Sequence, residues 1–318
     1  MAKPTRIFFV ADLHGSAVCF RKFVNAARVY RADVLIVGGD IAAKTMTPVF
    51  EGPDGWSATL EGERRTARSP EELDRLEGWL RDSSTVPFRT RPAAWTELIA
   101  NRPEADRVFL GLELDELRRW LAFARTRLAG SGARLLLGLG NDDFTPMEEV
   151  IAHDGFAELT DSAVLRLDAG HELVTLAYSN PTPWRTNREL PEEEIARRVD
   201  RDVARLERVD RAVFNLHVPP HNTPLDLAPR LDANLVKVMA PGGEPDMIHV
   251  GSTAVRAALE RHQPLLGLHG HIHESKGVVE IGRTRAINPG SAYTEGTLLG
   301  VVVDLEPDRV RASVLTSG

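Results

Sequence analysis

Short motifs of acidic and histidine residues occur at intervals along the chain and have the types and spacing of metal ligands. Asp12-Leu13-His14 places a carboxylate and an imidazole two residues apart, and Gly270-His271-Ile272-His273 does the same for two imidazoles. Between them, in order, lie three further oxygen or nitrogen ligands: Asp40, Asn141 and His217. These seven groups suit two divalent ions that share one carboxylate, a combination used to hydrolyse phosphate esters.

The apolar runs of the chain predict where these side chains meet. Residues 7–10, 34–37, 135–137, 173–176, 212–216 and 265–268 have the composition of buried parallel strands. Residues 17–30 have helical periodicity and turn the first two runs into a βαβ unit. Every candidate ligand follows the end of such a run, which is where open α/β sheets place their ligand sites. Four short strands over residues 277–315 suggest a second sheet packed on the first.

Residues 44–106 depart from this pattern and are expected to be an insertion within a single domain of residues 1–318. Residues 49–68 resemble a hairpin, because Gly52-Pro53-Asp54-Gly55 is a strong turn signal. Ser69-Pro70 begins a helix with a good N-cap, and residues 112–128 form a further amphipathic helix. The insertion is either a lid over the strand ends or a structural elaboration away from the site.

The ordered motifs resemble the signature of the calcineurin-like metallophosphoesterases. The matching pieces are Asp12-x-His14, Gly39-Asp40, Gly140-Asn141-x-Asp143, His217 and Gly270-His271-x-His273. Residues 268–275 and 287–291 further resemble a prokaryotic branch related to cyclic-nucleotide phosphodiesterases, whose members are mostly predicted phosphoesterases. The resemblance implies an α/β fold of two packed β-sheets flanked by helices, a four-layer α/β/β/α sandwich with a helical and hairpin insertion.

The same resemblance implies how the ligands divide between two divalent metal ions. Asp12, His14 and His273 would hold one ion, and Asn141, His217 and His271 the other. Asp40 would bridge the two, and Mn, Fe, Zn or Ni would accept these ligands. The implied reaction is hydrolysis of a small phosphomonoester or phosphodiester, in which a hydroxide shared by the ions attacks phosphorus in line.

One position departs from the family pattern. In most of the superfamily a histidine follows the metal-binding asparagine, contacts the substrate and can protonate the leaving group, whereas Asp142 stands here. Two nearby cations favour the ionised carboxylate, so Asp142 is expected to be a poor proton donor. Either the leaving group needs no strong acid, or His221, four residues beyond His217, takes over. Asp142 and His221 are therefore both candidate catalytic residues.

A proline-stiffened loop after another strand carries two candidate substrate-binding residues in addition to Asn141. Trp184 could stack on a base and Arg185 could pair with a phosphate oxygen. A rigid surface loop is the alternative interpretation of the same residues. The remaining histidines are expected not to be ligands; His269 is assigned a structural role near the site, and the others are His153, His171, His249 and His262.

Composition narrows the class of protein. The 318 residues carry a formal net charge of −7, which disfavours a duplex nucleic-acid binder. No apolar run approaches the roughly 20 residues that span a bilayer, and the single cysteine, Cys19, is expected to be a buried thiol. We therefore expect a cytoplasmic enzyme without a membrane partner, its oligomeric state left open. The alternatives are a metal-binding scaffold on the same fold or, less favoured, a nuclease.

Overall fold

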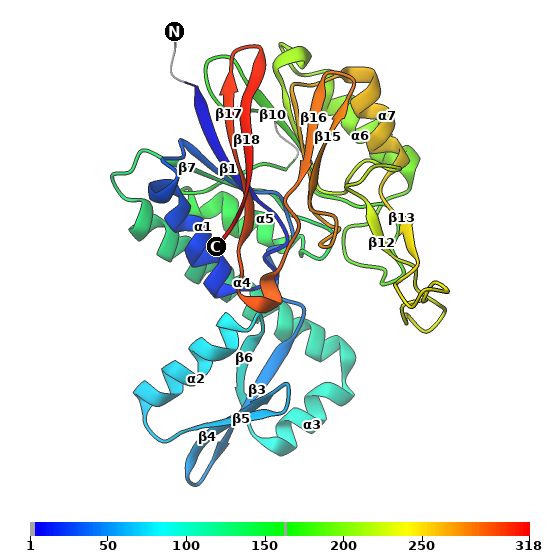
Figure 1. Ribbon diagram of the computed structural model, residues 1–318. Coiled ribbons are helices and arrows are strands. Elements are labelled where there is room, and N and C mark those ends of the chain that lie inside the picture. The colour runs from blue at the N-terminus through cyan, green and yellow to red at the C-terminus, as the bar shows by residue number, and fades with distance from the viewer. Residues whose placement is uncertain (1–3, 162–163) are drawn as a thin grey trace.

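Two six-stranded sheets pack against each other at the centre of the molecule (Figure 1). The computed structural model describes residues 4–161 and 164–318. The first sheet has the order β18-β17-β1-β2-β7-β8, with β1, β2, β7 and β8 parallel and β17 antiparallel to β1. Its strands are β1 (Thr5–Val10), β2 (Val34–Val37), β7 (Arg134–Leu137), β8 (Glu158–Leu159), β17 (Leu299–Glu306) and β18 (Arg309–Ser317).

The second sheet also has a parallel centre, and both of its edge strands are antiparallel to their neighbours. Its order is β15-β16-β14-β11-β10-β9, and β10, β11, β14 and β16 run parallel. Its strands are β9 (Val164–Arg166), β10 (Glu172–Leu176), β11 (Val213–Leu216), β14 (Leu266–Leu268), β15 (Gly277–Ile281) and β16 (Thr284–Asn288). Because the central strands are parallel, their carboxyl ends gather at one edge of each sheet.

Successive side chains along a strand point to opposite faces of its sheet, which explains why the molecule has four layers. Ile7 and Phe9 of β1 join a core cluster shared by both sheets, whereas Phe8 joins the cluster beneath the helices of the first sheet. That first sheet is covered by α1 (Ala17–Val29), α4 (Arg102–Leu128) and α5 (Pro146–Asp154). The second is covered by α6 (Glu192–Val203) and α7 (Thr253–His262). The α/β/β/α sandwich expected from the resemblance is confirmed.

The C-terminal tail divides between the two sheets, which corrects the expectation of one separate sheet. β15 and β16 belong to the second sheet, but β17 and β18 extend the first, with β17 paired to β1. β-Strand propensity indicates that a segment is extended and does not identify its partner strand. Cys19 is buried on α1, as expected, and Ser16 caps that helix by accepting from Cys19 N.

The insertion forms a lobe with its own small core (Figure 1). The hairpin expected over residues 49–68 is a three-stranded antiparallel meander, and a fourth strand pairs parallel to its first strand. The lobe contains β3 (Met46–Gly52), β4 (Gly55–Leu60), β5 (Glu63–Ala67), β6 (Val86–Thr90), α2 (Pro70–Asp82) and α3 (Pro92–Ala100). Ser69 caps α2 by accepting from Glu72 N, as predicted.

The chain returns from the lobe through α4, which begins ten residues before the predicted start. Its second half enters the main core through Leu117, Trp120 and Leu121, so this helix joins the lobe to the sandwich. The remaining elements are η1 (Val209–Arg211), β12 (Leu227–Pro229), β13 (Met247–His249) and η2 (Tyr293–Glu295). Within residues 4–161 and 164–318, no helix combines the length and hydropathy that a membrane crossing requires.

Glu113 is a buried carboxyl group at the junction between lobe and sandwich. One of its oxygens accepts from Ala43 N at 3.2 Å, and the other, Oε1, has no hydrogen-bond partner among the described residues. Burial raises the pKa of Glu113 to about 8, and the charges of Asp143 and Glu116 add to the shift. Glu113 is therefore predominantly uncharged in the folded protein below that pH.

Substituting Glu113 should change the pH dependence of folding. In the unfolded chain the Glu113 carboxyl ionises near pH 4.5. The stability that its neutral form contributes is therefore fully present below that pH and is lost as pH rises through about 8. Glu113→Gln stays neutral and keeps an acceptor for Ala43. The variant should match wild type near pH 4.5 and exceed its free energy of unfolding by on the order of 3 kcal/mol at pH 8.5.

Urea unfolding at both pH values measures this difference. Glu97→Gln on the exposed face of α3 is the control and should show no growing difference. A gap between wild type and Glu113→Gln that does not widen with pH would show that the carboxyl is ionised without cost.

Candidate metal centre

The carboxyl ends of both sheets meet at the predicted site, and each sheet supplies part of it. From the first sheet come the loop after β1 with Asp12 and His14, the loop after β2 with Asp40, and the loop after β7 with Asn141. From the second come the loop after β11 with His217 and the loop after β14 with His271 and His273. Residues as far apart in the sequence as Asp12 and His273 thus lie in one cluster.

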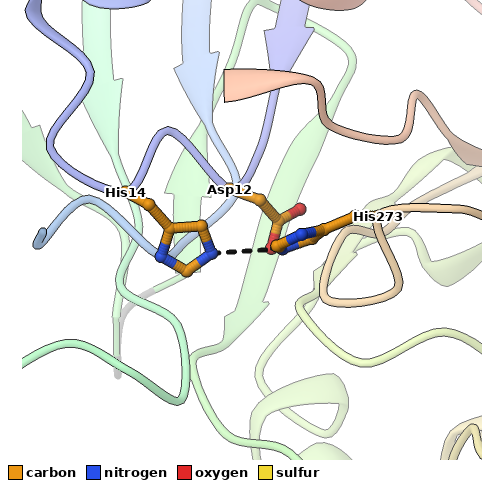
Figure 2. A group of neighbouring side chains, drawn as sticks. All are labelled: Asp12, His14 and His273. Atoms are coloured by element: carbon orange, nitrogen blue, oxygen red, sulfur yellow. Dashed lines mark hydrogen bonds and ion pairs between the residues drawn. The ribbon is translucent and has the colours of Figure 1, made fainter. Parts of the chain in front are cut away.

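Asp12, His14 and His273 form the first group of side chains suited to an ion (Figure 2). His14 Nε2 lies 3.1 Å from His273 Nε2, and His273 Nε2 lies 3.6 Å from Asp12 Oδ1. Asp12 and His14 are buried, whereas His273 is partly exposed. This is the set that the resemblance assigned to one ion.

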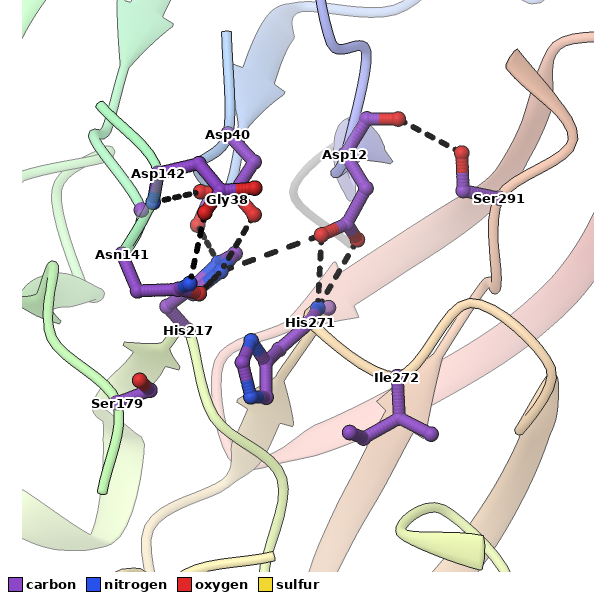
Figure 3. A network of polar contacts seen from close by, with 12 residues as sticks. Asp12, Gly38, Asp40, Asn141, Asp142, Ser179, His217, His271, Ile272 and Ser291 are labelled. Carbon is purple, nitrogen blue, oxygen red and sulfur yellow. Dashed lines mark hydrogen bonds and ion pairs between the residues drawn. The ribbon is translucent and has the colours of Figure 1, made fainter. Parts of the chain in front are cut away.

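Asp40, His217 and His271 form the second group, with Asn141 beside it (Figure 3). His217 Nε2 lies 3.4 Å from Asp40 Oδ2 and 3.1 Å from Asn141 Oδ1. His217 Nδ1 lies 3.2 Å from the carbonyl oxygen of Gly38, which can only accept, so this nitrogen carries the proton. An ion bound in the cluster would displace any proton from His217 Nε2, which faces Asp40 and Asn141.

Asp40 lies between the two groups. Its Oδ2 is 3.4 Å from His217 Nε2 and 3.6 Å from His14 Nε2, which belongs to the first group. Asp40 also appears in a third group, with His14 and Asp142, whose ligand atoms all lie within 4.8 Å of one another. The carboxylate that the resemblance named as a bridge is thus within reach of both sides.

The donor set fits divalent ions. Two ligands of one ion at the usual bond lengths stand about 3.0 to 3.5 Å apart, and the separations of 3.1 to 3.6 Å are close to that range. His14 Nδ1 is buried and has no hydrogen-bond partner among the described residues. Buried carboxylates and imidazoles gathered without apolar filling are a costly arrangement unless cations compensate them.

The charges within the cluster compensate one another in part. Burial works against ionisation of Asp40, but His217 and His14 outweigh it and hold the pKa of this carboxyl below its usual range. Burial lowers the pKa of His217, but the nearby carboxylate of Asp40 raises it by more, so the pKa lies above its ordinary value. His271 has a pKa lowered to about 4 by burial and by His217, so it is neutral and able to ligate near pH 7.

Backbone strain is concentrated at the same residues. Asp12, His14, Asp40 and His271 all have φ between 41° and 65°, the left-handed region that residues with a Cβ seldom adopt. Each such residue costs of order 1 to 3 kcal/mol and persists only when surrounding contacts enforce it. Four of seven predicted ligands in this state indicate loops shaped for the site rather than for stability.

The contacts that enforce these loops involve residues that sequence reasoning did not assign a role. Asp143 is buried and accepts from Ile41 N, Ala42 N and Gly140 N at 2.7 to 2.8 Å, which joins the loops after β2 and β7. It stands within the quoted motif, so its presence was visible although its role was not. Burial and the charge of Asp40 raise the pKa of Asp143 to about 7.

A second set of contacts holds the loop after β14. Asn288 Nδ2 donates to the carbonyls of Gly270 and Ile272, at 3.3 and 2.9 Å. Ser291 Oγ donates to the carbonyl of Asp12 at 2.7 Å (Figure 3). The backbone N–H of His271 donates to both carboxylate oxygens of Asp12, at 2.9 and 3.0 Å. Residues 287–291 were quoted as part of the resemblance, and the structure shows their physical use.

Two glycines allow the loops to approach so closely. A Cβ at Gly140 would lie 2.2 Å from Asp40 Oδ1 and 2.7 Å from the His217 ring. A Cβ at Gly270 would lie 2.4 Å from Ala11 Cβ and 2.5 Å from Asp12 Oδ2. Neither position tolerates a side chain without displacement of a predicted ligand.

Asn141 is oriented by the loop that carries Trp184 and Arg185. Its Nδ2 donates to Thr186 Oγ1 at 2.9 Å and to Asp142 Oδ1 at 3.2 Å, which turns Oδ1 toward His217. Asn187 Nδ2 donates to the carbonyl of Asp142 at 2.9 Å, so the loop is bound to the cluster at two points. Thr186 and Asn187 were not predicted, and no local signal marks them.

Trp184 and Arg185 lie on the exposed side of that loop. Trp184 is 61% exposed, and Arg185 is exposed and has positive φ. Within the described part of the chain, the guanidinium of Arg185 has no ion-pair partner. Their loop is thus fixed beside Asn141 and Asp142, while the two side chains stay accessible.

His221 is placed among other partners. Its Nδ1 lies 3.4 Å from Asp226 Oδ2, and its ring stands 5.9 Å from that of His249, which also pairs with Asp226. Among the described residues, the structure gives His221 no contact with a predicted ligand. Its catalytic role stays a prediction.

The histidines expected not to be ligands lie outside the cluster or behind it. His269 Nδ1 donates to the carbonyl of Leu216, so this buried ring ties β14 to the residue before His217. The others bond to a helix carbonyl or to carboxylates: His153 to Glu149, His171 to Asp168, His249 to Asp226 and His262 to Asp200.

Asp142 has a cationic partner that sequence reasoning missed. Lys44 Nζ lies 3.1 Å from Asp142 Oδ2, and the same oxygen lies 3.7 Å from His14 Nδ1. In the protein itself, burial and the charge of Asp40 raise the pKa of Asp142, and Lys44 opposes them. Tyr293 packs its ring on His14 and His273, with centroids 4.7 and 5.7 Å apart.

Comparison with known proteins identifies the fold. No family model matches the chain. The uncharacterized protein MJ1162 of Methanocaldococcus jannaschii is 33% identical over 118 residues, which are 36% of this chain and 46% of that protein. The match thus spans less than half of that relative.

Two solved structures are similar over nearly the whole chain. One has a TM-score of 0.56 and 13% identity and covers 98% of both chains. The other, TT1561 of Thermus thermophilus, has a TM-score of 0.52 and 12% identity and covers 99% of this chain and 98% of its own. The chain shares its overall fold with these two structures, and its α/β/β/α sandwich is the one that the motif resemblance implied. Identities this low show a shared fold alone.

Closing the gap at Gly140 should weaken ion binding at this candidate metal centre. Gly140→Ala pushes a methyl group against Asp40 and His217, so the affinity for divalent ions should fall more than roughly tenfold. Gly111→Ala on α4, where a Cβ meets nothing within 4 Å, is the control and should leave ion affinity unchanged. Competition with a chromogenic chelator measures both. Equal affinity in the two variants would place the ions elsewhere.

Removing the hydroxyl of Thr186 should release the amide of Asn141. Thr186→Val keeps the shape but loses the acceptor for Asn141 Nδ2, so the affinity of the second ion should fall by roughly tenfold. Thr186→Ser retains the oxygen and should bind like wild type. Isothermal titration of the ion-free protein separates the two. Indistinguishable Val and Ser variants would contradict the assigned orientation of Asn141.

Proposed function

We propose that this chain is a metal-dependent hydrolase of small phosphate esters that works with two divalent ions. The resemblance of the ordered motifs supports the class of protein, and the grouped carboxylates and imidazoles support metal dependence. The observation that carries the proposal is the position of Asp40, whose Oδ2 lies within 3.6 Å of a histidine of each group. A carboxylate shared in this way suits a pair of ions better than two separate sites.

The residues divide as two half-sites with one member in common. Asp12, His14 and His273 would hold one ion, and His217, His271 and the amide oxygen of Asn141 the other, with Asp40 contributing to both. Bound divalent ions supply charge stabilisation at the phosphoryl oxygens and a nucleophilic water at neutral pH.

The chain's own groups prepare these ligands. The Gly38 carbonyl fixes the tautomer of His217, and the Thr186 hydroxyl fixes the amide of Asn141. Such outer contacts orient ligands and increase their basicity. The strained loops add rigidity, because the hydrogen bonds of Asp143 hold Gly140 and Ile41 in register.

The surroundings of the site support a small phosphorylated substrate. Trp184 and Arg185 stand exposed on a loop fixed to Asn141 and Asp142, where a base or sugar portion would find an aromatic face and a guanidinium. Because His221 contacts Asp226 and His249 instead, the placement favours a leaving group that departs without a proton from His221.

Single-ligand variants should remove the ions one half-site at a time. Wild type should retain two ions per chain after desalting, and both His273→Ala and His271→Ala should retain one. Asp40→Asn should lose both, because each half-site depends on that carboxylate. Elemental analysis of the desalted protein gives the stoichiometry. Loss of one ion in Asp40→Asn with the other intact would show that Asp40 does not bridge.

Activity is tested by loading ion-free protein separately with Mn, Fe, Zn or Ni. A phosphomonoester, an aryl phosphodiester and cyclic nucleotides are assayed in parallel, and turnover of at least one ester that disappears in Asp40→Asn supports the proposal. Stoichiometric binding of two ions with no turnover under any loading would instead favour a metal-binding scaffold.

A further inference from the structure

Lys44 is the residue at which the chain leaves the sandwich for the insertion lobe, and its backbone is held on both sides. Ala43 N donates to Glu113 Oε2 on α4 at 3.2 Å. The Thr45 carbonyl accepts from Val86 N of the lobe at 3.0 Å and from Thr85 Oγ1 at 3.1 Å. The lobe therefore fixes where Lys44 stands.

From this point the side chain reaches the metal centre and stays accessible. Its ammonium lies 3.1 Å from Asp142 Oδ2, and the side chain is 46% exposed. Among the contacts of the described residues, Asp142 is the sole partner of this ammonium. An ammonium has three N–H donors, so two remain for a ligand.

Electrostatics near Lys44 favour its charged form. Although burial lowers the pKa of Lys44, Asp142, Tyr293 and Asp40 more than compensate, so the pKa lies above its ordinary value. The group is thus a permanent cation beside Asp142. It cancels the charge of Asp142, which would otherwise repel an incoming phosphate.

We propose that Lys44 binds a phosphoryl oxygen of the substrate and makes the enzyme selective for phosphomonoesters over phosphodiesters. This inference rests on the proposed function. Asp142 is the positioning residue that holds the ammonium in place. The insertion lobe then contributes to substrate choice through Lys44, at the point where it joins the sandwich.

Oxygen and charge counts point to monoesters. A monoester has three non-bridging oxygens and a diester two, and the two ions and Lys44 together are three cationic partners. Asp12, Asp40 and Asp142 leave one net positive charge on two divalent ions, and Lys44 increases it to two. A monoester near pH 7 carries close to two negative charges, whereas a diester carries one.

Lys44→Met tests the proposal in the metal-loaded protein. We expect kcat/KM for a phosphomonoester to fall at least tenfold and that for an aryl phosphodiester less than threefold. Lys44→Arg keeps a cation and should recover most of the monoester activity. Lys237→Met, on an exposed loop, is the control and should change neither.

Binding of inorganic phosphate gives a readout apart from turnover. Titration calorimetry should show phosphate affinity for loaded Lys44→Met at least fivefold below wild type, with two ions still bound per chain. In an Asp142→Ala background the same substitution should cost less, because Lys44 is no longer held.

The outcomes separate the two proposals. Equal losses on both ester classes, or unchanged phosphate affinity, would overturn the role of Lys44 while leaving the hydrolase intact. Absence of turnover in wild type under every metal would refute the proposed function instead. Lys44→Gln is the second variant should Lys44→Met fold poorly, and the same thresholds apply to it.

Discussion

The buried carboxylate of Asp40 is the constraint around which the site is organised. It lies within 3.6 Å of histidines from both sheets, so its position requires the two sheet edges to meet. A carboxylate buried in this way is costly unless positive charge surrounds it. His217, whose pKa is raised, supplies part of that charge, and bound ions would supply the rest. The packing of the two sheets therefore brings to one edge the positive groups that this buried carboxylate requires.

The local backbone shows how the fold meets that requirement. Left-handed φ angles at Asp12, His14, Asp40 and His271 are unfavourable, and each loop is held by hydrogen bonds from outside it. Asp143 holds the loops of the first sheet, and Asn288 holds the loop after β14. The stability of two well-packed sheets thus compensates strain where ligands must point inward.

The insertion lobe is more than a neighbour of the site. Its strands and α4 clamp the segment around Lys44, and Ser84 Oγ approaches the carbonyl of Tyr293 at 3.5 Å. Lys44 and Tyr293 both border the first half-site. A lobe with a separate core can vary without disturbing the ligands, which makes it a suitable place for substrate preference to reside.

Local patterns determined the ligand types, their places after the strands and the N-cap at Ser69, because strand ends and caps depend on neighbouring residues. The family resemblance supplied the division of the ligands into two sets. Tertiary structure alone decided that β17 pairs with β1, that Thr186 orients Asn141, and that Lys44 faces Asp142. These contacts join segments 45 to about 300 residues apart, and nothing in the local sequence specifies such partners, since they arise only when the sheets pack.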